Sequence, residues 1–521
     1  MHHISFFQKL LLLAVILVGG LLVYSPHFSY PYPLHVDEWH HIEGALRLFT
    51  DNYFKGVNKA EVGFHFILYL VSLLFDLVLV YKFLPAIWFS VTIFTLFLVV
   101  HRQSKGNYFI SILSCIFFIS LKSNVNLMGP WFFTPLTFAT PFVYLYVYLF
   151  MRGMVEGGEG STTPAYGHPS SSVRRGSRPH LHEGGAETKS GGGGVYGDST
   201  WLYLLGSLLV MLFLIPIHAI SVFFAIPILA LYLLLNFGLL KKHWMKLLIF
   251  LVVPIVGALV YFLFFNGSWG NLEAVFLFRK GWGILELNNS LTEVYSLAGL
   301  LLSALGFCCI IFNRKKFRHF EVYAIWGVVS LLMILIFKIW DVSFFAPYQR
   351  YMYYLALSLP VLSALGVEFV LKTLLLVIAG AGVKEKSKLI LNYSVTMGSL
   401  ALIAFFVFQM YFVLPPQSRT YNAIDELDYQ TMLYLRDLPP GKVISPGLTT
   451  MAVYPIARKM VVSSLVYVPN LGQQNFYLAD SCEKKEKVLS NNKAKYVISR
   501  SIIGCGWEIV YNKGQVIYRI D

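Results

Sequence analysis

The sequence predicts a polytopic α-helical membrane protein of about eleven transmembrane helices, followed by a small α/β domain on the external side. Hydrophobic residues make up 57% of the 521 positions, charged residues only 13%, and the mean hydropathy is +0.63. Several apolar runs reach about 18 residues, which soluble domains rarely contain. The net charge of +14 comes from Lys and Arg spread over short loops, a pattern typical of topology signals. Nucleic acid is therefore not an expected partner.

The apolar segments alternate with loops in a way that indicates a topology. The predicted spans are 6–24, 83–100, 108–121, 136–151, 201–216, 220–237, 247–265, 294–312, 321–339, 352–378 and 389–413. With this assignment the basic clusters all fall on one side, which the positive-inside rule makes cytoplasmic. An odd number of spans then places the region from Pro415 onward outside.

Two loops need separate treatment. The first external loop runs from about 25 to 82, and its apolar piece Gly63–Val80 could be a further span. Counting it as one would move Arg102 and Lys105 outside, so we interpret it as an interfacial or re-entrant segment. Gly153–Thr200 is rich in Gly, Ser, Pro and His without apolar periodicity. It is predicted to be a disordered cytoplasmic loop.

The stretch from His35 to His41 is the candidate functional site. It puts two adjacent carboxylates and three imidazoles just beyond the first span. Apolar residues at three- and four-residue steps predict an amphipathic helix on the membrane surface: Trp39, Ile42, Leu46 and Phe49. Asp37 is the expected N-cap of this helix. Capping does not explain why Glu38 and the histidines crowd the same place.

Arg350 is the second candidate, because it stands at the external end of a long apolar span. A cation there is costly to bury without an anionic partner. A phosphate suits the planar guanidinium, while the alternative is that the side chain reaches the lipid head groups. Arg279 and Lys280, in another external loop, are weaker candidates for the same anion.

The region 415–521 has the pattern of a small α/β domain. Ile424–Leu438 has helical spacing. Strands are predicted at Lys442–Ser445, Met460–Ser463, Lys495–Ser499, Trp507–Tyr511 and Gln515–Ile520. On an oxidising side of the membrane Cys482 and Cys505 could form a disulfide. The domain is expected to cover or position substrate.

Four features of the chain occur together: the acidic pair in the first external loop, the long external segment before the second span, Tyr348-Gln349-Arg350-Tyr351 entering a late span, and the terminal α/β domain. This combination resembles the GT-C superfamily of glycosyltransferases, especially protein O-mannosyltransferases and aminoarabinose-transferase-like enzymes that use polyprenyl-phosphate sugars. The resemblance covers most of the chain as architecture, through short motifs. It implies a GT-C catalytic domain in 1–414, Asp37 as catalytic base and Arg350 at the lipid phosphate. In one departure, Lys122–Pro135 has no acidic residue, where members often carry one.

The chemistry of these residues agrees with the resemblance. Inverting transfer needs a carboxylate to take the acceptor proton and a cation to stabilise the leaving phosphate. Asp37 would be the base, with Glu38 orienting the acceptor or tuning Asp37, and Arg350 the phosphate ligand, helped by Lys280 or Arg279. Four further residues are expected to position donor or acceptor: His40, His41, Tyr348 and Tyr351.

A metal is an open point. His35, Asp37 and His41, with Glu38 and His40 beside them, offer oxygen and imidazole ligands for Mn²⁺, Mg²⁺ or Zn²⁺. We expect no obligatory metal, because Arg alone can neutralise a monophosphate leaving group.

The expected donor is a polyprenyl- or dolichyl-phosphate sugar, and the acceptor a lipid, glycan or protein. The expected location is a prokaryotic plasma membrane, with the site on the external face, or the endoplasmic reticulum in a eukaryote. The alternative is a transporter or flippase for a lipid-linked or anionic substrate, which predicts charges deep in several spans. The predicted spans are instead mostly free of charge.

Overall fold

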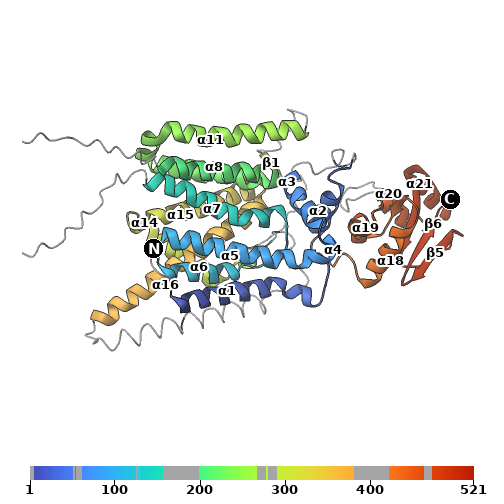
Figure 1. The fold of residues 1–521 in the computed structure, drawn as a ribbon, viewed down its shortest axis with the longest axis horizontal. Helices are drawn as coiled ribbons and strands as arrows, with labels where there is room; N and C mark the ends of the chain where they lie inside the picture. Colours follow the sequence, from blue (N-terminus) through green and yellow to red (C-terminus); the bar gives the residue numbers. More distant parts are fainter. Residues whose placement is uncertain are drawn as a thin grey trace, which may run out of the picture.

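The computed structural model is a bundle of long helices with a smaller α/β part at one end (Figure 1). The structure describes residues 5–50, 53, 61–124, 127, 129–156, 199–266, 277–279, 290–380, 398, 422–462 and 472–520. Helices α2 (Val36–Arg47), α3 (Val62–Ser72) and α4 (Leu77–Val80) lie at the end of the bundle that faces the α/β part (Figure 1). The helices of the first loop therefore stand where the two parts meet.

Six helices among the described residues are long and apolar enough to cross a membrane, so the chain is a multi-pass membrane protein. They contain α1 (Phe6–Tyr24), α5 (Leu84–Gln103), α8 (Ser199–His218), α11 (Phe237–Asn266), α15 (Glu321–Trp340) and α16 (Tyr348–Gly380). Other predicted spans coincide with shorter or less apolar helices: α6 (Tyr108–Ile119), α7 (Pro135–Glu156), α9 (Ile220–Phe223) with α10 (Ala225–Leu235), and α14 (Leu297–Phe312). The last predicted span, 389–413, lies outside the described residues except for position 398. The total of about eleven stays a prediction.

Helices α14 and α16 approach so closely that backbone meets backbone. A Cβ added at Gly306 would lie 1.9 Å from the carbonyl oxygen of Leu362, and one at Gly366 would lie 2.0 Å from that of Leu302. Small residues at such crossings permit the close packing that drives helix association in lipid. The contact fixes α16, whose first turn carries Arg350.

The α/β part is built on a four-stranded mixed sheet of order β3-β4-β6-β5. Its strands are β3 (Lys442–Ile444), β4 (Ala494–Ser499), β5 (Glu508–Lys513) and β6 (Gln515–Arg519). β3 runs parallel to β4, and the other neighbours are antiparallel. The helices are α18 (Glu426–Asp437), α19 (Thr450–Ala457), α20 (Gly472–Leu478) and α21 (Cys482–Asn492). The predicted strand Met460–Ser463 contributes only an isolated bridge between Val461 and Val443.

A disulfide joins Cys482, at the start of α21, to Cys505, in the segment before β5. The Cα atoms of the two residues are 5.4 Å apart, which is ordinary for this cross-link. It ties a helix on the sheet to the loop that leads into the β5–β6 hairpin, far from the helix bundle in the fold (Figure 1).

Helix α2 is enclosed by protein rather than lying on the membrane surface. Trp39 and Ile42 are fully buried in an apolar cluster that includes Phe64 of α3 and Val453 of α19. The predicted interfacial placement of this face is therefore wrong, because other parts of the chain cover it. Phe49, beyond the end of α2, is the exposed member of the predicted stripe.

Polar contacts also attach the α/β part to the first loop. The guanidinium of Arg47 donates to Glu43 at 2.6 Å and stands 4.6 Å above the ring of Tyr454 in α19. The Tyr32 hydroxyl donates to the carboxylate of Glu426 at 2.6 Å. Such stacked and charge-assisted contacts fix orientation as well as adding stability.

The close contact of α14 with α16 predicts that Gly366→Ala destabilises the protein. The added methyl would meet a backbone carbonyl, which cannot rotate away, so the helices must separate, at a cost of about 1–3 kcal/mol or more. Thermal unfolding in detergent should show a lower Tm than wild type. Gly238→Ala is the control, because nothing lies within 4 Å of its added Cβ. Equal Tm values for the two variants would contradict the packing argument.

Candidate active site

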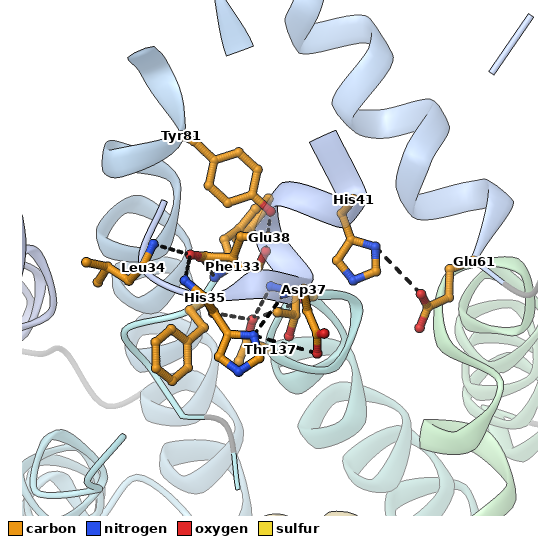
Figure 2. Close-up of polar contacts among 11 residues, drawn as sticks. Leu34, His35, Asp37, Glu38, His41, Glu61, Tyr81, Phe133 and Thr137 are labelled. Atoms are coloured by element: carbon orange, nitrogen blue, oxygen red, sulfur yellow. Dashed lines mark hydrogen bonds and ion pairs between the residues drawn. The ribbon is translucent and has the colours of Figure 1, made fainter. Parts of the chain in front are cut away.

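The start of α2 is fixed by His35 and Glu38. The His35 ring accepts a hydrogen bond from the amide of Asp37 through Nδ1 at 3.0 Å. Glu38 Oε2 accepts from the amides of Leu34 at 2.7 Å and His35 at 2.9 Å (Figure 2). His35 is therefore the N-cap, and the expectation that Asp37 caps the helix is wrong. The reciprocal bonds form a capping box in which a histidine replaces the usual Ser or Thr.

The other oxygen of Glu38 binds a distant segment. Its Oε1 accepts from the amide of Phe133 at 2.7 Å, in the stretch before α7, and the Tyr81 hydroxyl donates to the carbonyl of Phe133 (Figure 2). Burial raises the pKa of Glu38 to about 8, although the three amides, which favour the ionised form, act in the opposite direction. Because both oxygens face backbone amides, we interpret Glu38 as a positioning residue rather than one that contacts the acceptor.

Asp37 occupies a different environment from its neighbour. Its side chain is 43% exposed, and one carboxylate oxygen lies 3.7 Å from His35 Nδ1. Nδ1 already accepts the Asp37 amide hydrogen, so it has no proton to donate to the carboxylate, which is left available to another group. The helix thus buries the carboxylate of Glu38 and leaves that of Asp37 partly exposed.

A second set of titratable groups joins α2 to α3. His41 Nδ1 lies 3.1 Å from His65 Nε2 and 3.7 Å from Glu61 Oε2; Figure 2 shows the side chains of His41 and Glu61 pointing toward each other. His65 Nδ1 is in turn 2.7 Å from the hydroxyl of Tyr53. The sequence analysis did not identify Glu61 or Tyr53. The spacing of Glu61 and His65, four residues apart at the start of a helix, was the available signal.

Burial sets the protonation of this second set. It lowers the pKa of His65 to about 3 and that of His41 well below its usual value, so both rings are neutral. Burial raises the pKa of Glu61 to about 8; the charge of Asp37 adds to this effect and that of Arg350 opposes it. Among the described residues no bond joins Glu61 to Asp37 or Arg350, so both charges act on it through space.

Arg350 lies in the first turn of α16 and is half-buried. Its backbone amide donates to the carbonyl of Pro347 at 2.9 Å. Among the described residues no carboxylate forms an ion pair with its guanidinium. A buried, unpaired cation is costly, so this position suits an anionic ligand supplied from outside the chain.

Tyr348 and Tyr351, expected to position substrate, anchor the start of α16. The ring of Tyr348 stacks on Phe337 of α15 at 4.5 Å. The Tyr351 hydroxyl donates to the carbonyl of Phe344 in β2 (Val342–Phe344) at 2.8 Å. Both tyrosines are fully buried. These contacts fix the helix turn that carries Arg350, and the substrate-positioning role of the two tyrosines stays a prediction.

The remaining predicted residues have mixed outcomes. Arg279 ends β1 (Leu277–Arg279), which pairs with β2 so that Arg279 stands opposite Val342. Lys280 lies outside the described residues. The ring of His40 is 5.8 Å from that of His41, and burial lowers the pKa of His40. Arg279 and His40 stay candidates for substrate contacts.

The described residues bring together a different metal-ligand set from the predicted one. Ligand atoms of His41, Glu61 and His65 all lie within 4.8 Å of one another, and the described residues contain no other such group of three. Of the expected ligands, His41 belongs to this group, while His35 and Asp37 do not. His35 is engaged in capping α2, which explains its absence.

Comparison with solved structures reveals membrane glycosyltransferases. Archaeoglobus fulgidus AglB, an oligosaccharyltransferase solved with an inhibitory peptide and a dolichol-phosphate, superposes with a TM-score of 0.60 at 12% identity, over 95% of this chain and 70% of that one. A second AglB structure, with Zn and sulfate, gives 0.54 at 13% identity over 93% and 68%. Cupriavidus metallidurans ArnT bound to undecaprenyl phosphate gives 0.55 at 12% identity over 98% and 97%.

The chain has the GT-C fold. Neither a protein-family model nor a curated protein matches the sequence. At these identities the similarity shows the fold alone, and the activity has to be argued from the residues of this chain. The resemblance first drawn from the acidic pair, Arg350 and the terminal domain is confirmed at the level of the fold.

The bonds of Glu38 predict that Glu38→Gln destabilises the protein. The amide keeps one acceptor oxygen but turns an NH₂ group toward backbone donors, which costs about 1–3 kcal/mol for each buried group left unpaired. Tm in detergent should fall. Glu508→Gln is the matched control, because Glu508 is about half-exposed and pairs only with an exposed arginine. If Glu38→Gln unfolds no earlier than Glu508→Gln, Glu38 does not hold the loops together.

Proposed function

We propose that this protein transfers a sugar from a polyprenyl-phosphate donor to an acceptor hydroxyl on the external face of the membrane, with inversion at the anomeric carbon. The observation that carries the proposal is a partly exposed carboxylate, Asp37, together with a half-buried guanidinium, Arg350, that has no carboxylate partner among the described residues. The GT-C fold supports it, since AglB and ArnT have been solved with dolichol-phosphate and undecaprenyl phosphate.

In this proposal Asp37 is the general base. It takes the proton of the acceptor hydroxyl while the oxygen attacks the anomeric carbon of the donor sugar. The bond between that carbon and the phosphate oxygen breaks, and its electron pair stays on the phosphate. The exposure of the Asp37 carboxylate supports this role, because an acceptor can reach it. Glu38 keeps Asp37 in place through the hydrogen bonds at the start of α2.

Arg350 holds the phosphate in this proposal. The guanidinium offers several N–H donors in a plane that matches phosphate oxygens, and the charge stabilises the leaving group as it develops. Its place at the start of α16, a candidate span, suits a donor whose chain lies in the lipid while its head group reaches the site. Arg279, on the β1–β2 ribbon that precedes α16, is a second candidate for the same head group.

The acceptor is proposed only as a class. A lipid, glycan or protein hydroxyl would each satisfy the chemistry of Asp37. The α/β part packs on α2 through Trp39 and Arg47, and so we infer that it shapes the space in which the acceptor lies. The distribution of basic loops indicates that the site lies on the non-cytoplasmic side of the membrane. This membrane would be a plasma membrane or, in a eukaryote, that of the endoplasmic reticulum.

The base assignment predicts that Asp37→Asn lowers transfer from a polyprenyl-phosphate sugar about 100- to 10,000-fold, the usual contribution of a general base. Binding of the donor should be retained, because the amide keeps the size of the side chain. The measurement is transfer of labelled sugar in proteoliposomes, over a panel of donors. Asp76→Asn, in the same loop, is the control, since asparagine still caps α4. Full transfer by Asp37→Asn would exclude the base role.

The phosphate assignment predicts that Arg350→Ala raises the Kd for polyprenyl phosphate about 10- to 100-fold, since a charge-assisted hydrogen bond is worth about 1.5–3 kcal/mol. Arg350→Lys should recover part of the loss, because the charge returns without the planar fork. Arg436→Ala removes a half-exposed arginine of the α/β part and serves as the control. Unchanged donor affinity in Arg350→Ala would remove Arg350 from the donor site.

A further inference from the structure

We propose that His41, Glu61 and His65 form a binding site for a divalent transition metal of the Zn²⁺ type, with an open coordination position that takes a phosphate oxygen. The metal-binding part of this inference is independent of the glycosyltransferase proposal. The phosphate part rests on it, because the phosphate would be that of the donor.

The geometry of the three ligand atoms fits one metal ion. His41 Nδ1 is 3.1 Å from His65 Nε2 and 3.7 Å from Glu61 Oε2, and all three atoms lie within 4.8 Å of one another. Tetrahedral zinc binds nitrogen and oxygen at about 2.0–2.2 Å, which separates its ligands by roughly 3.3–3.6 Å. The two distances from His41 are within a few tenths of an ångström of this spacing, and the ligand atoms of Glu61 and His65, at most 4.8 Å apart, would have to approach by no more than about 1.5 Å.

A hydrogen bond between the two histidines does not account for the whole cluster. Two neutral rings can share one hydrogen at 3.1 Å. The Glu61 carboxylate, 3.7 Å from His41 Nδ1 and only 23% exposed, is then beyond hydrogen-bond distance. No other described residue donates a hydrogen bond to it. A cation bound between the three side chains would satisfy the carboxylate and both nitrogens together.

The surroundings hold the ligands in place as they do in metal sites. The second nitrogen of His65 lies 2.7 Å from the Tyr53 hydroxyl, an outer contact that fixes the ring and its tautomer. Gly44 in α2 leaves room for the ring, because a Cβ there would lie 2.6 Å from His65 Cε1. Both ligand-bearing helices are also packed into one apolar cluster through Trp39 and Phe64.

The donor set selects the class of metal. Two imidazoles and one carboxylate suit zinc or a neighbouring transition metal, whereas Mg²⁺ prefers oxygen ligands in an octahedron. Three protein ligands leave a fourth position open, as in catalytic zinc sites. The guanidinium of Arg350, which has no carboxylate partner among the described residues, is a second candidate partner for an anion bound at the open position. A phosphate monoester matches both groups.

The first experiment measures metal content and affinity without any sugar substrate. Purified full-length protein in detergent is stripped with EDTA, dialysed against ZnCl₂ and assayed by elemental mass spectrometry and calorimetry. We expect about one zinc per chain in the wild type, a rise in Tm on zinc addition, and a fall in affinity of at least about 10-fold in Glu61→Gln and His41→Gln. His40→Gln, which changes the adjacent histidine outside the cluster, should bind zinc as the wild type does.

Either of two results would overturn the site. One is a stripped wild type that takes up no zinc; the other is binding by Glu61→Gln and His41→Gln that equals the wild type, which would put the metal elsewhere. If a ligand variant does not fold, the Co²⁺-loaded wild type decides by its visible spectrum. An intense tetrahedral spectrum that Gly44→Ala alters supports the site, and an octahedral spectrum refutes it.

The open position is tested on the same Co²⁺ protein. A short-chain prenyl phosphate should shift the visible spectrum, and inorganic phosphate tests whether the phosphate alone is sufficient. The shift should need a higher concentration of prenyl phosphate in Arg350→Ala. An unchanged spectrum with both phosphates would refute the phosphate part and leave the metal count as a separate result. A wild type that binds zinc normally but transfers sugar from none of the donors would count against the proposed function and not against the metal site.

Discussion

Three backbone amides donate hydrogen bonds to the carboxylate of Glu38, and the arrangement of the site depends on them. Two amides belong to the residues that lead into α2, and the third belongs to Phe133, before α7. Because one carboxylate serves donors 95 positions apart in sequence, it joins the first loop to the helix bundle. Asp37, the residue before Glu38, is held at that junction with its side chain partly exposed.

The same end of the bundle is reinforced from two other directions. The α/β part covers the apolar face of α2 through Trp39 and Ile42, and α16 is fixed against α14 by glycines that let their backbones touch. Tyr348 and Tyr351 anchor the first turn of α16 by stacking and by a hydrogen bond. Asp37 and Arg350 therefore stand on separately supported elements, as preorganised sites require.

The carboxylate of Glu61 connects the proposed metal site with the proposed donor site. Burying a carboxylate is costly unless a cation or hydrogen-bond donors compensate it. Here His41 Nδ1 lies 3.7 Å from the Glu61 carboxylate, and the charge of Arg350 opposes the rise of its pKa that burial causes. In the two proposals a metal ion would bind beside Glu61, and a phosphate would bind that ion and Arg350. Asp37, which is more exposed, remains on the side from which an acceptor would approach.

The sequence by itself determined the membrane class, the positions of most helices, most strands of the terminal part and the fold family. These follow from apolar length, periodicity and turn residues, which are local properties. It also made Asp37 and Arg350 candidates for the site, because charged residues beside apolar spans are conspicuous, and both stay predictions. Only the tertiary structure decided that His35 caps α2, that Glu38 faces inward, that Tyr348 and Tyr351 are buried at the start of α16, and that Glu61 and His65 join His41. Those roles depend on which distant groups meet, such as Phe133 with Glu38, and no local pattern encodes such contacts.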